Sequence, residues 1–112
     1  MRVGDKPKLI LSVISHAQAD CVRDLNAAAQ ELLIYGVDGA RLWSSNDCYP
    51  EQSNDVRTLT PGQKVDFAVV WSGKTSSPGC ATPRHVLGAG SYLLEANQGG
   101  VVSQRVPLNI QP

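Results

Sequence analysis

The chain has 112 residues and a formal net charge of zero, because ten basic residues balance ten acidic ones. This length suits one domain, which we expect to span residues 1–112. The balanced charge, without a basic cluster or tail, argues against a nucleic-acid partner. No stretch approaches the ~18 apolar residues of a membrane span, so membrane contact is expected only through an anchor upstream of this sequence.

The apolar residues of the first half alternate with a period of two, which indicates β-strands. A first strand is expected over 8–14, followed by a mixed segment over 16–29. The end of that segment, 24–30, is expected to form one short helical turn, since it holds three consecutive alanines. Strands over 31–35 and 40–44 are joined by an Asp-Gly pair, which is a strong hairpin signal.

The second half continues with short strands and defined turns. Residues 45–55 are polar and rich in turn formers, so they are expected to form a loop. A strand over 56–59 is followed by Thr60-Pro61-Gly62-Gln63, which fits a type II turn because glycine supplies the positive φ at its third position. The clearest strand covers 64–71. Its alternating apolar residues end at Trp71, which is expected to lie in the core.

The last third combines a long loop with two more strands. Residues 72–90 are rich in Gly, Ser and Pro and predict a loop. Tyr92 opens a strand over 92–96, and it resembles the tyrosine corner of sandwich domains, whose hydroxyl bonds to the backbone upstream. A Gly-Gly turn then leads into one final strand over 101–110. Pro107 indicates a free edge or a bulge in that strand.

Short strands at regular spacing predict an all-β sandwich or barrel. If the strands alternate up and down between two sheets, the loops 16–29, 45–55 and 72–90 fall at the same end. These three loops carry the cysteines Cys21, Cys48 and Cys80. We therefore expect the cysteines to gather at one end of the molecule.

The cysteines lie among loop-forming residues instead of in the apolar strands. This placement favours disulfides over buried free thiols, and hence an oxidising compartment. Because three is an odd number, either one thiol is free or one pairs with a cysteine upstream of this sequence. Three incidental thiols in a cytosolic protein remain the alternative.

The sequence offers few residues for metal binding or catalysis. The cysteines and the two histidines, His16 and His85, show no close ligand pair such as CxxC, so no metal is expected. Cys80, His85 and Asp47 could assemble into a nucleophile, base and acid set, but no flanking signature supports that set. We therefore expect neither an enzyme nor a cofactor.

Three motifs carry a resemblance to a known family. The runs RLWSSNDCYP (41–50), VRTLTPGQKVDFAVVWSG (56–73) and GAGSYLLEA (88–96) resemble the intracellular proteinase inhibitor family of Bacillus. The match spans roughly residues 41–110. It implies an immunoglobulin-like β-sandwich of about seven antiparallel strands. The chain also looks like envelope-anchored, cysteine-containing actinobacterial versions of this domain.

The resemblance suggests which cysteines pair. Cys48 and Cys80 flank the best-matched strands, so a Cys48–Cys80 disulfide is expected. Cys21–Cys48 is the second choice. In the favoured pairing, Cys21 stays unpaired or pairs upstream, where Met1 is expected to be an expression start that replaces a longer natural N-terminus.

The expected function is that of a non-catalytic binding or structural domain of a cell-envelope protein, outside the cytoplasm. Its partner is expected to be an envelope protein or a cell-wall glycan, bound through the loop end. The candidate contacts are Arg23, Trp43, Asp47, Tyr49, Lys74 and Arg84. For Trp43 and Tyr49, core or loop packing is the competing interpretation.

The first alternative function is a proteinase inhibitor that presents a loop to a serine protease. The second is an enzyme that uses Cys80 or the loop carboxylates.

Overall fold

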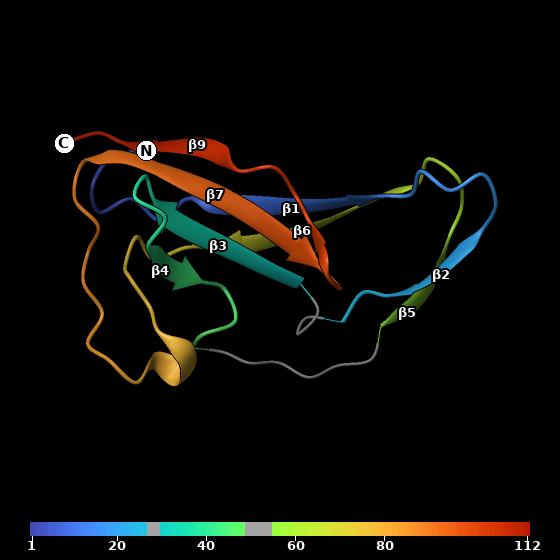
Figure 1. Ribbon diagram of the computed structural model, residues 1–112, viewed down its shortest axis with the longest axis horizontal. Coiled ribbons are helices and arrows are strands. Elements are labelled where there is room, and N and C mark those ends of the chain that lie inside the picture. The colour runs from blue at the N-terminus through green and yellow to red at the C-terminus, as the bar shows by residue number, and fades with distance from the viewer. Residues whose placement is uncertain (27–29, 49–54) are drawn as a thin grey trace.

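The computed structural model describes residues 1–26, 30–48 and 55–112 (Figure 1). The expectation of an all-β chain is confirmed, since the described part holds nine strands, all paired antiparallel, and one 3-10 turn. The elements are β1 (Lys8–Ile14), β2 (Cys21–Asp24), β3 (Gln30–Gly36), β4 (Arg41–Ser44), β5 (Val56–Leu59), β6 (Lys64–Val70), η2 (Pro78–Cys80), β7 (Gly90–Gln98), β8 (Val101–Val102) and β9 (Val106–Ile110).

The strands form three sheets. Strand β1 pairs with β6, β2 pairs with β5, and a five-stranded sheet runs β4-β3-β7, with both β8 and β9 along the outer side of β7. The β2–β5 pair, which we call the arm, projects at one end of a molecule that measures 46 × 26 × 23 Å (Figure 1). The 3-10 turn η2 lies at the opposite end (Figure 1).

Two expectations about the strands are wrong in detail. The sequence predicted about seven strands, but it missed β2, whose inward positions hold Cys21 and Arg23 instead of large apolar residues. The expected final strand over 101–110 is two strands, β8 and β9. Regular strand pairing is interrupted between β8 and β9 at Ser103. There the Ser103 amide donates to the Ala96 carbonyl, and the Ala96 amide donates to the Ser103 hydroxyl instead of to a backbone carbonyl. The expected helical turn over 24–30 is wrong at both ends, since Asp24 belongs to β2 and Gln30 to β3; its residues 27–29 lie outside the described residues.

The turns form where glycine permits them. Gly62 has a φ of 78°, and the amide of Gln63 donates to the carbonyl of Thr60 over 3.0 Å, as the predicted type II turn requires. Gly99 and Gly100, with φ of 57° and 89°, close the turn between β7 and β8. Two successive positive φ angles suit a tight hairpin that keeps the twist of its strands.

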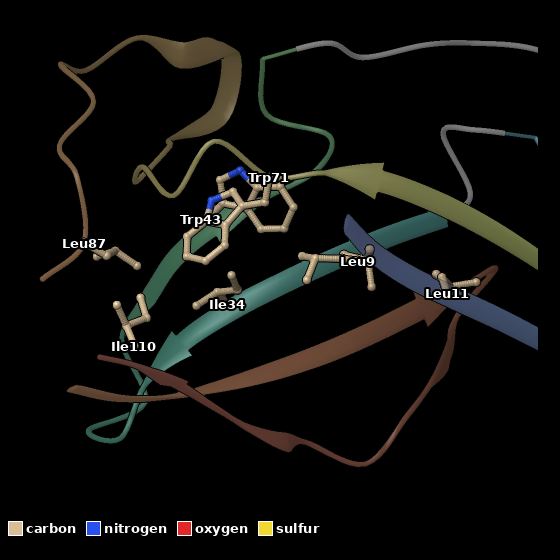
Figure 2. Packing of buried hydrophobic residues seen from close by; sticks show 8 residues of the cluster. Leu9, Leu11, Ile34, Trp43, Trp71, Leu87 and Ile110 are labelled. Atoms are coloured by element: carbon tan, nitrogen blue, oxygen red, sulfur yellow. The ribbon is translucent and has the colours of Figure 1, made fainter. Parts of the chain in front are cut away.

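The main core lies between the β1–β6 pair and the five-stranded sheet (Figure 2). Leu9 and Leu11 of β1 and Ile34 of β3 belong to this core, and all three are buried. Trp71, which follows β6, is fully buried, and its ring lies 5.7 Å from that of Trp43 in β4. The expected core position of Trp71 is therefore confirmed.

Tyr92 joins the start of β7 to the loop before it. Its hydroxyl donates to the carbonyl of Gly88 over 2.8 Å. This is the upstream backbone bond that its position in the sequence predicts. In the described part of the chain β9 forms a ladder only with β7, and its Pro107 stands opposite Leu93. On the other side of β9, residues 1–3 bond only to its end, at Asn109 and Gln111. The predicted free edge is confirmed.

We expect Trp71→Ala to lower the free energy of unfolding by about 3–5 kcal/mol, because it leaves a cavity between the two layers. Urea unfolding monitored by far-ultraviolet circular dichroism measures the loss. Val22→Ala serves as the control, since Val22 is 69% exposed. A loss below about 1 kcal/mol for Trp71→Ala would contradict the central role of this side chain.

Candidate functional site

The loop end of the molecule consists of the segments 45–48 and 72–89. Cys48 and Cys80 lie here at disulfide distance, with their Cα atoms 5.0 Å apart. The structure thus brings together the two cysteines expected to pair. Cys80 has a φ of 53°, which is rare outside glycine. In this conformation the Cys80 amide donates a hydrogen bond of 2.7 Å to the carbonyl of Ser77.

Cys21 lies apart from this pair. It begins β2 in the arm, is free, and is partly buried. The segment 15–20 before it is at the end of the molecule opposite η2 (Figure 1). The expectation that the loop 16–29 joins the other two loops is therefore wrong, because the chain turns out of the core layer after β1 to build the arm.

Asp47 is the polar centre of the loop end. Arg41 donates to both of its carboxylate oxygens, over 3.1 and 2.7 Å, and the Ser76 hydroxyl donates to one of them over 2.6 Å. The amide of Ser76 also donates to the carbonyl of Leu42. Asp47 is only 5% exposed, so this charge is buried, whereas the side chain of its partner Arg41 stays 34% exposed. These bonds connect β4 to the 72–89 loop beside the cysteine pair.

The charges around Asp47 decide its ionisation. Burial raises the pKa of the Asp47 carboxyl, but hydrogen bonds from Arg41 and Ser76 and the charges of Arg41 and Arg84 lower it by more, so the net pKa lies below the ordinary value. The bond to Asp47 also raises the pKa of the Arg41 guanidinium. Glu31 lies 3.9 Å from Arg41 and accepts a hydrogen bond from Ser44. Asp47 is therefore a structural anion at neutral pH.

Hydrogen bonds from the side chains of Trp71 and Arg84 hold the rest of the 72–89 loop. The Trp71 indole donates to the carbonyl of Lys74 over 3.0 Å. Arg84 donates to the carbonyl of Thr75 over 2.9 Å and to the hydroxyl of Ser72 over 3.2 Å. These hydrogen bonds from Trp71 and Arg84 therefore connect different parts of the loop to one another.

These contacts account for most of the six residues expected to touch a partner. Asp47 and Arg84 hold loops, and Trp43 is 5% exposed, which leaves little of its ring for a ligand. Arg23 lies in the arm, away from the loop end, and bonds to Gln98. Lys74 is exposed on the loop end. Tyr49 lies outside the described residues.

A groove that the sequence did not predict opens between the arm, the end of β1 and the β7–β8 hairpin. Its volume is about 500 Å³, and its walls include Leu11, Val13, Leu59, Val101 and Val102. The pair of valines directly after the Gly-Gly turn breaks the alternation of the strands. That break was the available signal, because it leaves both valines without a core position.

The described residues offer neither a metal-binding cluster nor a membrane helix. Within residues 1–26, 30–48 and 55–112, no group of three or more His, Cys, Asp or Glu side chains lies close enough to hold a metal ion. No helix in the described part of the chain is long and apolar enough to cross a membrane.

We expect Cys48→Ser with Cys80→Ser to lower the free energy of unfolding by about 3–4 kcal/mol, because the cross-link restricts the unfolded chain. The residues it joins are 32 positions apart. Urea unfolding without reductant measures the loss, and Cys21→Ser is the matched control. Equal stability of the double variant and the control would show that the pair is not bonded.

We expect Asp47→Asn to lower the free energy of unfolding at pH 7 by about 1–3 kcal/mol, since Arg41 and Ser76 lose their anionic acceptor. The carboxylate stabilises the fold above its unfolded pKa of about 3.9, and this contribution disappears as the pH falls through the lower folded pKa. The stability of the wild type should therefore fall more steeply than that of the variant between about pH 5 and pH 2.

Denaturant unfolding at a series of pH values measures this difference. Asp66→Asn is the control, since Asp66 is an exposed carboxylate on β6. Parallel pH profiles of Asp47→Asn and the wild type would rule out a stabilising buried anion at this position.

Comparisons of the chain with protein-family models, with curated proteins and with solved structures found no match.

Proposed function

We propose that the chain is a non-catalytic binding domain of a cell-envelope protein, working outside the cytoplasm. We further infer that its two main layers form an immunoglobulin-like β-sandwich. The β1–β6 pair and the five-stranded sheet enclose one core, and Tyr92 makes the bond of a tyrosine corner, which supports this assignment.

The observation that carries the proposal is the Cys48–Cys80 pair. Structural disulfides persist in oxidising compartments and are rare in the cytosol. The pair joins the two segments of the loop end. The hydrogen bonds of Asp47 with Arg41 and Ser76 form a second connection between them. A loop fixed in advance loses little conformational freedom on binding, which favours recognition by the loop end.

The recognition surface is the exposed part of the 72–89 loop. Lys74, the segment 81–83 and His85 are exposed there, while Asp47 and Arg84 support them from inside. The partner is an envelope protein or a cell-wall glycan. Lys74 is an exposed basic residue of this surface, and we base the test on it.

We expect the purified domain to cosediment saturably with cell envelopes of its source organism, and Lys74→Glu to weaken this binding about fivefold. Lys64→Glu reverses the same charge on β6 and should bind like the wild type. Envelopes digested with protease or with a glycan hydrolase identify which component is bound. Absence of saturable binding, or equal weakening by both variants, would refute a loop-end recognition surface.

A second candidate function is proteinase inhibition. The segment 78–83 is anchored at Cys80, and the Ser77 hydroxyl bonds to both the amide and the hydroxyl of Thr82. An exposed segment held in one conformation can bind in a protease active site. If the protease cleaves it, the new chain ends stay in place and are released slowly. Assays against a panel of serine proteases distinguish the candidates, since a binding domain alone leaves every protease fully active.

A further inference from the structure

The groove between the arm and the main layers is shaped to hold a small molecule. Three separate parts of the chain form its walls: residues 11–17, the arm with Cys21 and Arg23, and the β7–β8 hairpin. Its volume of about 500 Å³ falls in the range of ligand pockets in proteins. Most of the wall residues belong to β1, the arm and the β7–β8 hairpin.

The mouth of the groove leaves apolar side chains in contact with water. Ile14, Val101 and Val102 line it and are 47%, 62% and 54% exposed. Ile14 ends β1, and Val101 and Val102 make up β8, so two of the elements that border the groove carry exposed apolar side chains. Clustered exposed apolar residues beside a concave surface mark an interaction site.

Arg23 supplies a positive charge inside this apolar surface. Its side chain bonds to Gln98, through Nε to the side chain and through Nη2 to the carbonyl over 2.9 Å. Gln98 is 6% exposed and also donates to the carbonyl of Asp24, so it holds the guanidinium in place. Among the described residues, no carboxylate forms an ion pair with Arg23, and its Nη1 makes no hydrogen bond.

Arg57 shows how unusual this is. It stands directly opposite Arg23 in the β2–β5 ladder, yet it forms a bidentate ion pair with Asp55 and does not line the groove. The two arginines of the arm therefore differ both in position and in pairing. Arg23 lines the groove and, among the described residues, has no carboxylate partner, so it keeps hydrogen-bond donors and charge for an external anion.

We propose that this groove binds a free anionic amphiphile, with an apolar chain against Val13, Val101 and Val102 and a carboxylate on Arg23. A single cation inside an apolar surface complements a molecule with one anionic head and one apolar tail. An extended peptide fits less well, because the strands that border the groove at the arm and the hairpin, β2 and β8, have only four and two residues. This proposal is independent of the function assigned to the loop end.

Dodecanoate, kept below its micelle concentration, is the probe. We expect saturable binding by isothermal titration calorimetry and several-fold slower alkylation of Cys21 by iodoacetamide, because the Cys21 side chain lines the same groove. Arg23→Gln should weaken dodecanoate binding about tenfold, through loss of charge-assisted hydrogen bonds. Arg57→Gln combined with Asp55→Asn removes the ion pair opposite Arg23 without changing the net charge of the arm, and should leave binding unchanged.

A second variant covers the case in which Arg23→Gln disturbs the arm. Val101→Trp fills the mouth of the groove from an exposed position and should abolish both dodecanoate binding and the protection of Cys21. Dodecanol and dodecyltrimethylammonium, which lack the anion, should bind much more weakly than dodecanoate. Equal binding of all three probes, or none of dodecanoate, would overturn the proposal. So would binding only to phosphatidylglycerol vesicles, which would indicate a membrane surface instead of a free amphiphile.

Discussion

The packing of Trp71 against Trp43 is the contact on which the rest of the structure depends. In the described chain no strand of the β1–β6 pair is paired with a strand of the five-stranded sheet, so the core between them is made by packed side chains. Trp71 also fixes its surroundings through polar bonds: its amide donates to the carbonyl of Pro7, and its indole donates to the carbonyl of Lys74. One buried ring therefore positions both layers and the first residues of the loop end.

The two ends of the molecule use buried polar groups in different ways. At the loop end, Asp47 is satisfied by Arg41 and Ser76, so its charge serves the fold. At the arm, Gln98 is satisfied by Arg23 and Asp24, but Arg23 keeps its charge uncompensated by any described carboxylate. A closed network stabilises one conformation, whereas an open one leaves interaction energy for a ligand. This contrast is why we place recognition of an anion at the arm.

The sequence predicted those elements whose burial follows a simple pattern. Strands β1 and β6 alternate between core and solvent, and the turn at Gly62 needs a positive φ, so both could be foreseen. Strand β2 could not, because its inward residues are a cysteine and an arginine that no apolar period reveals. The groove could not either, since its walls come from segments far apart in the sequence. The loop end was foreseen only in part, because the arm carries its first loop to the opposite end.

Pro107 has a consequence for how copies of the molecule behave toward one another. It stands in the middle of β9, the outer strand on that side of the described sheet. Unprotected outer strands can pair with strands of other molecules and start aggregation. A proline has no backbone N–H, so a strand from another molecule would lose a hydrogen bond where it met Pro107. Pro107 therefore disfavours edge-to-edge pairing of β9 with strands of other molecules.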